Sequence, residues 1–309
     1  MIRHFLKLEF INYLSRQLFF LFVVISLLAN TAKSQNASLR QSINQIINTI
    51  DGKVGVAVMN IEKKDTLSIN GHSHFPMQSV FKFPLAMAVF QQVDQGQFSL
   101  DQKIHIEKKD LQPNFWSPLR EKYPNGNVDI SLSELLKFTV SESDNSGCDL
   151  LFRLLGGPIK VDKIIHSLGV KEIAIVATEE EMHKEWDVQY TNWCEPMAMI
   201  HLLEILNSGK ALSKSNNDFL LKLMTETTIG AKRIKGLLPK GTVVAHKTGL
   251  SDTNALGITA ATHDVGIVTL PDGNHLAIVV FVSNSKANQE NRERIIAQIA
   301  KVVWDYYVK

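Results

Sequence analysis

The sequence is poor in cysteine and nearly balanced in charge. Its 309 residues include only two cysteines, Cys148 and Cys194, and neither has neighbours at metal-ligand spacing, so we expect no cysteine-based metal site. The two could pair in an exported protein, but buried, free thiols are the favoured interpretation. The formal net charge of +2 leaves no basic stripe, which argues against nucleic acid as a partner.

Only one long apolar run is present, and it lies at the N-terminus. Arg3, Lys7 and Arg16 precede an apolar core from Leu18 to Ala29, and Ala32-Lys33-Ser34 fits a small-x-small cleavage site. The run is too short for a comfortable membrane span. We therefore predict a signal peptide over residues 1–34, with an uncleaved anchor as the alternative. Cleavage would remove four basic residues and one acidic residue, which changes the net charge from +2 to about −1. A periplasmic monomer without stable membrane association is expected.

Hydrophobic periodicity divides the remaining chain into three parts. Strand patterns lie near both ends, at 54–60, 66–70, 242–248, 264–270 and 276–283. Helical patterns lie between them, at 79–95, 131–141, 146–155, 194–208 and 216–226, and also near the two ends, at 39–50 and 295–306. This order predicts an α/β (α+β) fold, in which an antiparallel five-stranded sheet is flanked by N- and C-terminal helices and an all-α domain is inserted. Residues 35–76 and 231–309 would form the α/β sandwich domain, and 77–230 the all-α domain.

The stretch MQSVFKFPLAMAVF, residues 77–90, places a serine and a lysine in an otherwise apolar helix. Ser79 and Lys82 are three residues apart and would share one face of that helix. A buried lysine is costly unless its charge is paired or its pKa is lowered. The pair is therefore a candidate nucleophile and activating amine, although S-x-x-K alone is a weak signal. Pro84 is unexplained by this pattern, because a proline inside a helix strains the preceding turn.

Two further motifs follow in the order expected of serine acyl-transfer enzymes. SDN, at Ser143, Asp144 and Asn145, lies at a helix junction, and KTG begins at Lys247 at the end of a predicted strand. S-x-x-K, S-D-N and K-T-G together are typical of class A β-lactamases and penicillin-binding proteins. A polar, aromatic-rich stretch over 177–193 is predicted to be a structured loop. Asp144 is expected to be structural, and strand alternation directs His246 away from Lys247.

On these motifs the mature chain resembles a class A serine β-lactamase over essentially its whole length. The stretches FPMQSVFKFPLA, TVSESDNSGCDLL, EMHKEWDVQY and LPKGTVVAHKTG look like the extended-spectrum branch of PER- and VEB-type enzymes. The resemblance implies an α/β sandwich with an all-α domain, an active site at their junction, and no metal or other cofactor. Penicillins and cephalosporins, with extended-spectrum cephalosporins among them, are the implied substrates.

The resemblance also implies roles for individual residues. Ser79 would attack the lactam carbonyl to form an acyl-enzyme, helped by Lys82, and the backbone N–H groups of Ser79 and Leu250 would bind the oxyanion. Ser143 would pass a proton to the departing nitrogen, with Lys247 tuning the potential there. The other implied substrate contacts are Lys247, Thr248 and Ser251 for the carboxylate, Asn145 for the acylamino group and Trp116 for the cleft wall.

Within the loop, the resemblance makes Glu179 the base that activates the deacylating water, although Glu180 and Glu181 are adjacent candidates. Three further residues would support the loop. Asp149 would join a helix to it, His183 stands where relatives commonly have Asn, and Asn192 stands where most have a salt-bridged Asp.

At the rim of the cleft, two residues differ from the family's usual pattern, and these differences would affect the substrate range more than the reaction. Leu250 replaces a small or hydroxyl residue and loses a side-chain hydrogen bond, while Asp252 adds negative charge where Gly is common. Arg233 aligns with a position that in some members binds the substrate carboxylate, but an ordinary ion pair is an equal alternative. The rival functions are a D,D-peptidase or small penicillin-binding protein, and a β-lactam sensor domain.

Overall fold

The computed structural model describes residues 36–308, so the predicted signal peptide over residues 1–34 lies outside the described residues. The chain divides into two units, residues 1–45 and 46–309. Residues 36–47 are helical, in agreement with the spacing of Leu39 and Ile43. Across residues 36–308, none of the helices combines the length and hydrophobicity that a membrane span requires.

The second unit is built on the expected five-stranded antiparallel sheet. Its strands are β1 (Lys53–Asn60), β2 (Asp65–Ile69), β8 (Val244–Leu250), β9 (Thr259–Thr269) and β10 (His275–Ser285), in the spatial order β2-β1-β10-β9-β8. The strand ends differ from the prediction by up to five residues; β8 begins two residues later than expected and β9 five residues earlier. Strands β9 and β10 are buried on both faces over most of their length, because helices cover both faces.

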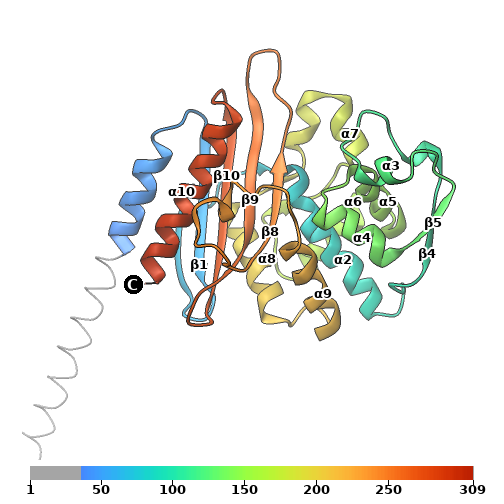
Figure 1. The fold of residues 1–309 in the computed structure, drawn as a ribbon, viewed down its shortest axis with the longest axis horizontal. Coiled ribbons are helices and arrows are strands. Elements are labelled where there is room, and N and C mark those ends of the chain that lie inside the picture. Colours follow the sequence, from blue (N-terminus) through green and yellow to red (C-terminus); the bar gives the residue numbers. More distant parts are fainter. Residues whose placement is uncertain (1–35, 309) are drawn as a thin grey trace, which may run out of the picture. The chain divides into compact units, whose positions relative to one another are not determined.

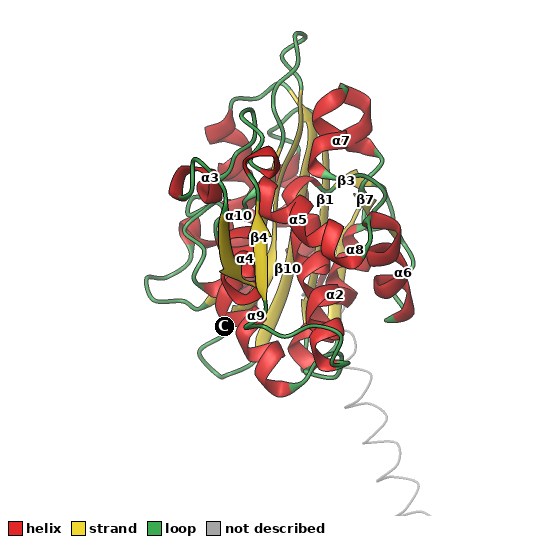
Figure 2. Cartoon of the chain, turned by 90° about the vertical axis from the view of Figure 1, so that its right-hand side faces the viewer, coloured by secondary structure: helices red, strands yellow, loops and turns green. Residues whose placement is uncertain are grey.

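Helix α10 (Gln289–Tyr307) lies on one side of the sheet, and the other helices of this unit lie on the opposite side (Figure 1). Those helices are α2 (Lys82–Asp94), α3 (Pro118–Lys122), α4 (Leu132–Ser141), α5 (Asn145–Leu155), α6 (Pro158–Ser167), α7 (Glu179–Lys184), α8 (Pro196–Ser208) and α9 (Lys214–Thr225). Figure 2 shows this layer in front of the long strands. Helix α8 contacts β1 and β10 directly, although it falls within the predicted all-α domain, and the boundaries at 76/77 and 230/231 stay predictions.

Helix α2 is buried on every side from Lys82 to Phe90. A short 3₁₀ helix, η1 (Gln78–Phe81), precedes it, so Pro84 is only the third residue of the α-helix. In the first turn an N–H has no partner within the α-helix, so proline costs little there. This position explains a residue that the sequence pattern left unexplained.

Two small sheets complete the fold and were not predicted, because strands of two to four residues give no readable alternation. One contains β3 (Phe75–Pro76), β7 (Trp193–Cys194) and β6 (Ile173–Ala174), and the other β4 (Lys103–Ile106) and β5 (Val128–Ser131). Short 3₁₀ helices lie at η2 (Lys108–Asp110), η3 (Trp186–Tyr190) and η4 (Ile234–Leu237). Cys148 and Cys194 are both free and buried, as favoured from the sequence, and burial raises the pKa of each thiol.

Candidate active site

A cavity of about 590 Å³ brings the sequence motifs together. It opens beside the end of β8, η1, the start of α5 and the loop over 177–193. Most of the predicted site residues line it, namely Ser79, Trp116, Ser143, Asn145, Glu179, His183, Arg233, Thr248, Leu250 and Ser251, with Asp252 at the same cavity. Lys82 and Lys247 are buried behind this lining.

Ser79 is held in η1 by strained and closely packed backbone. Gln78, directly before it, has a φ of +46°, a left-handed conformation that non-glycine residues rarely adopt. The Gln78 side chain donates to Gln189 Oε1 at 2.6 Å, which ties the serine segment to the loop. Strand β8 packs tightly against the segment that precedes Ser79, since a Cβ added to Gly249 would lie 2.6 Å from Met77 O. No sequence motif pointed to Gln78 or Gln189 themselves.

Lys82 is the hub of the site. Its Nζ donates to Ser79 Oγ at 2.8 Å, to the backbone carbonyl of Ser143 at 2.9 Å and to Asn145 Oδ1 at 2.5 Å. The side chain is fully buried, so its polar partners offset the cost of burying an amine. The i, i+3 spacing predicted for Ser79 and Lys82 thus produces a direct hydrogen bond.

Glu179 is the first residue of α7 and its carboxylate faces the same amine. Glu179 Oε1 lies 2.8 Å from Lys82 Nζ, and the side chain is 3% exposed. The three donors of an ammonium are already directed to Ser79, Ser143 and Asn145. Glu179 Oε1 therefore lies in an ion pair but receives no hydrogen bond from residues 36–308. This buried oxygen, at the lining of the cavity, is positioned to accept a proton from a water molecule.

Ser143 and Lys247 form a second hydroxyl–amine pair. Lys247 Nζ donates to Ser143 Oγ at 2.8 Å and to the carbonyl of Thr248 at 3.1 Å. Burial, and next the charge of Lys82, holds the pKa of Lys247 well below its ordinary value. Ser143 has a φ of +58°, so its hydroxyl and its carbonyl reach two different lysines from one strained residue.

The register of β8 fixes the direction of the Leu250 N–H group. Ser251 N donates to Ala261 O, and N–H groups alternate in direction along an antiparallel strand. Leu250 N–H must therefore point away from β9. Because β8 is the edge strand of the sheet, this N–H faces the side on which Met77 and Ser79 lie. It can serve as a donor for an oxyanion formed at Ser79 Oγ.

The loop is held by side-chain hydrogen bonds of Asp149 and Asn192 to its backbone. Asp149 accepts from the backbone N–H groups of Glu179 and Glu180 at 2.8 and 2.9 Å. Burial, and next the charge of Glu179, raises the pKa of Asp149 to about 7. Asn192 is fully buried; its Oδ1 accepts from Val176 N and Ala177 N, and its Nδ2 donates to Ala177 O. The neutral amide of Asn192 thus fixes the start of the loop through hydrogen bonds, without a salt bridge.

Several remaining residues are engaged in ways the sequence did not reveal. His183 Nδ1 bonds the carbonyl of Glu179 at 2.7 Å, and its ring packs on Phe115. Ser251 Oγ donates to Asp252 O and accepts from Ala261 N. Trp116 is 58% exposed and donates to Glu142 O, so one face of its ring is available as a cavity wall.

Arg233 lies at the cavity but is also tied into the sheet. Its Nη1 donates to the carbonyls of Gly249 and His263, and its Nε lies 3.2 Å from Glu293 Oε1. The ion pair weighed from the sequence is therefore present, and the carboxylate-binding role stays a prediction. His246, as expected, points away from the site; its Nδ1 lies 2.8 Å from Asp264. Asp144 caps α5 by accepting from Gly147 N and also binds Ser117 and Leu119 N, which is a structural role.

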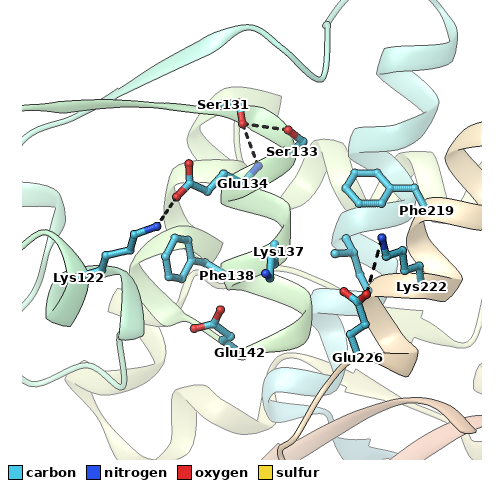
Figure 3. Close-up of a pocket in the computed structure, with 11 residues that line it drawn as sticks. Lys122, Ser131, Ser133, Glu134, Lys137, Phe138, Glu142, Phe219, Lys222 and Glu226 are labelled. Carbon is cyan, nitrogen blue, oxygen red and sulfur yellow. Dashed lines mark hydrogen bonds and ion pairs between the residues drawn. The ribbon is translucent and has the colours of Figure 1, made fainter.

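A second hollow, of about 470 Å³, lies between α4 and α9 and contains none of the predicted site residues (Figure 3). Two of its three lysines pair with glutamates, Lys122 at 2.8 Å from Glu134 and Lys222 at 3.7 Å from Glu226, and its three lysines and three glutamates balance in formal charge. Such mutual neutralisation leaves little charge for a ligand. The chemistry is concentrated in the first cavity.

Comparison with known proteins agrees with this geometry. Residues 38–307 match the Beta-lactamase enzyme family. The chain is 48% identical to beta-lactamase VEB-1 of Pseudomonas aeruginosa over 90% of this chain and 93% of that protein. It is 42% identical to the extended-spectrum beta-lactamase PER-1 of the same organism, over 93% of each. The crystal structure of a beta-lactamase from Chitinophaga pinensis superposes with a TM-score of 0.86 at 58% identity, covering 87% of this chain and 99% of that chain.

Proposed function

The chain belongs to the beta-lactamase enzyme family and hydrolyses the amide bond of β-lactam antibiotics, which confers resistance; we propose that Ser79 and Glu179 divide this reaction between them. The observation that carries the proposal is the position of Lys82 Nζ, 2.8 Å from both Ser79 Oγ and Glu179 Oε1. Nucleophile and base therefore share one buried amine.

Acylation begins at Ser79 Oγ, which attacks the lactam carbonyl while its proton passes to the Lys82–Glu179 pair. The backbone N–H groups of Ser79 and Leu250 stabilise the tetrahedral oxyanion. As the C–N bond breaks, Ser143 donates its proton to the lactam nitrogen. Lys247, whose pKa is lowered, is hydrogen-bonded to Ser143 and supports this transfer.

Deacylation requires a water molecule that attacks the ester carbonyl. Glu179 Oε1 receives no hydrogen bond from the described residues and can accept the proton of that water. The product acid then leaves, and Ser79 regains its proton. Two bonds between α7 and Asp149 hold Glu179 in this position.

Substrate selection rests on the remaining residues of the cavity. We assign carboxylate binding to Lys247, Thr248, Ser251 and Arg233, and acylamino binding to Asn145, with Trp116 as the wall. The similarity to PER-1 supports activity on extended-spectrum cephalosporins. The apolar Leu250 side chain, 43% exposed at this rim, offers contact area without a hydrogen bond. Comparison of kcat/KM for an oxyimino-cephalosporin and a simple penicillin tests this range.

We also propose that residues 1–34 direct export and that the mature enzyme acts as a periplasmic monomer. The charge and hydropathy of that segment support export. Cell fractionation, N-terminal sequencing and light scattering of the mature protein test the three parts separately.

The decisive experiment follows the hydrolysis of a chromogenic cephalosporin together with the mass of the protein. Wild type should turn over continuously, while Glu179→Gln should accumulate the acyl-enzyme. The matched control is Glu180→Gln, since the side chain of Glu180 is exposed and pairs with Lys184 on the surface; it should behave as wild type. Normal deacylation by Glu179→Gln would remove Glu179 from the base role. A single stoichiometric burst from wild type would instead indicate a penicillin-binding protein or a sensor.

A further inference from the structure

Three residues with side chains that can bind a metal ion, His74, Glu172 and Glu195, lie together at one end of the small sheet formed by β3, β7 and β6. Strand β7 pairs with both neighbours, with Phe75 opposite Cys194 and Ile173 opposite Cys194. One step further along each antiparallel pair places His74 and Glu172 on either side of Glu195. The backbone bond from Glu195 N to Glu172 O, at 3.0 Å, agrees with this register. Directly opposed residues of a sheet point to the same face, so the three side chains converge.

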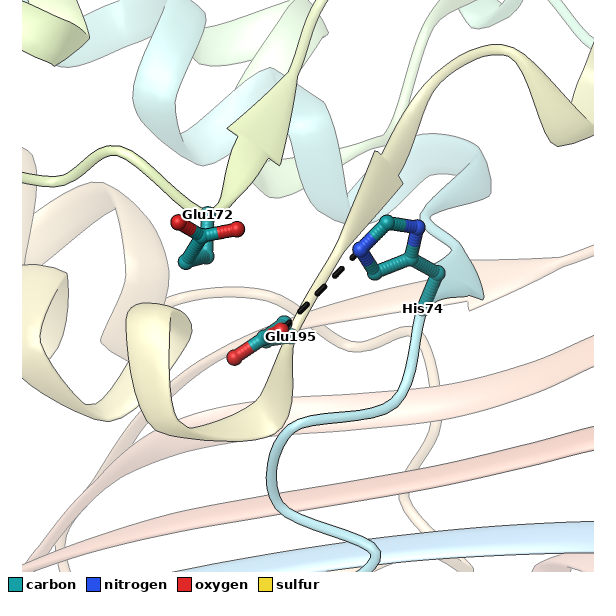
Figure 4. Close-up of side chains that lie close together, drawn as sticks. All are labelled: His74, Glu172 and Glu195. Carbon is teal, nitrogen blue, oxygen red and sulfur yellow. Dashed lines mark ion pairs between the residues drawn. The ribbon is translucent and has the colours of Figure 1, made fainter.

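Their ligand atoms are close enough to share one ion. One imidazole nitrogen of His74 and one carboxylate oxygen each from Glu172 and Glu195 all lie within 4.8 Å of one another (Figure 4). His74 Nε2 is 4.0 Å from Glu195 Oε1. Ligands at about 2.0–2.1 Å from a tetrahedral zinc ion are separated by roughly 3.3 Å, so side-chain movements of about 1 Å would complete the set.

Two of the three groups, His74 and Glu195, are held in place by contacts with neighbouring side chains. The His74 ring stacks on Trp193, with ring centroids 3.5 Å apart and planes inclined by 11°. Glu195 is the N-cap residue of α8, yet its side chain makes no capping hydrogen bond. Instead its carboxylate, 10% exposed, faces His74 through one oxygen and His72 through the other, the latter at 2.9 Å. Such a partner on the second oxygen is how outer residues orient a metal-binding carboxylate.

We propose that His74, Glu172 and Glu195 form a binding site for one divalent transition-metal ion of the zinc type, separate from the catalytic cavity. Imidazole and carboxylate are ordinary zinc ligands, and two carboxylates balance the charge of the ion. His74 and Glu172 are exposed, so the ion can enter from solvent and water can complete the coordination.

A metal ion here would join three chain segments that also support the active site. Asn192 and Trp193 are consecutive, and Asn192 O accepts from Met77 N, two residues before Ser79. The ion would thus hold the start of the serine segment and the end of the loop over 177–193 in fixed relation. Metal binding stabilises the native state and does not enter the reaction.

Calorimetric titration of the tag-free, chelator-treated protein with zinc chloride tests the proposal, alongside the thermal midpoint with and without zinc. Wild type should bind one equivalent and gain thermal stability, because the ion binds the native state. His74→Phe keeps the ring on Trp193 but removes the ligand, and it should weaken binding by about tenfold or more. Glu195→Gln should do the same.

His105→Ala is the matched control, because His105 is a half-exposed histidine paired with Asp129 on the other small sheet. It should bind zinc as wild type does. Circular dichroism and the metal-free thermal midpoint establish that each variant is folded. The proposal is overturned if wild type binds no zinc, or if folded His74→Phe binds it with unchanged stoichiometry and affinity.

Discussion

Asp149 shows how a single buried carboxyl couples catalysis to stability. It accepts two backbone N–H bonds from the start of α7, which favour its charged form, yet burial and the neighbouring Glu179 outweigh them. The result is a carboxyl whose pKa is raised to about 7. Below about pH 7 Asp149 is therefore mostly neutral, so Glu179 has no second full negative charge beside it.

We predict that Asp149 lowers stability as pH rises. Between about pH 4 and 7 the native Asp149 holds a proton that the unfolded chain has released, so the free energy of unfolding falls, by up to about 1.4 kcal/mol per pH unit. Asp149→Asn should remove this slope. Urea unfolding of both proteins at several pH values measures the difference, with exposed Asp101→Asn as the control. Parallel pH profiles for wild type and Asp149→Asn would contradict the prediction.

At the scale of elements, the neutral side chain of Asn192 anchors the start of the loop over 177–193. Asn192→Ala removes three hydrogen bonds at once, two of them buried, and leaves their backbone partners without this side chain. We expect a loss of about 2–4 kcal/mol of unfolding free energy, together with slower deacylation as Glu179 loses its position. Urea denaturation and acyl-enzyme mass measure the two effects. The adjacent, exposed Thr191→Ala should change neither; equal effects from both variants would argue against a specific role for Asn192.

Strand β8 and η1 must approach closely for the oxyanion donors to meet. Gly249→Ala would place a methyl group 2.6 Å from Met77 O, and the strand would have to move outward. A displacement of about 1 Å at the donors should lower kcat/KM by roughly 100-fold while the protein stays folded. Gly236→Ala is the control, since its methyl meets only Ala297 and Ala231. Steady-state kinetics measure the effect. An unchanged kcat/KM in Gly249→Ala would show that the packing of β8 against Met77 does not position the oxyanion donors.

The long helices were predictable because apolar residues recur along them at helical spacing, and the long strands because they are continuous apolar runs. Shorter elements were not. Helix α6 buries only Val161 and Ile165, which gives a weak period, and β3, β6 and β7 have two residues each. Helix α7 was expected only as part of a structured loop, although Thr178 and Glu181 mark its start in the sequence by forming a reciprocal capping box. The site followed from local motifs, but the contact between Lys247 and Ser143 joins residues 104 apart, and only the family resemblance anticipated it.

At the scale of the whole molecule, we predict that stability does not depend on redox conditions, because the two cysteines form no disulfide with each other. Cys148 and Cys194 are unpaired and fully buried. A thiol reagent should therefore label neither cysteine in the native protein and both after unfolding, and dithiothreitol should leave the thermal midpoint unchanged. Spectrophotometric thiol counting and a thermal scan measure these outcomes. A midpoint lowered by reductant would indicate a disulfide in the protein.

The left-handed backbone at Gln78 and Ser143 has an evolutionary consequence. Each conformation costs about 1–2 kcal/mol in a residue with a Cβ, and glycine at position 78 or asparagine at position 143 would relieve it. Backbone strain therefore favours replacement at both positions, whereas antibiotic exposure and the side-chain hydrogen bonds from Gln78 to Gln189 and from Lys247 to Ser143 oppose it. In lineages released from that exposure, these two codons should be among the first in the catalytic centre to drift.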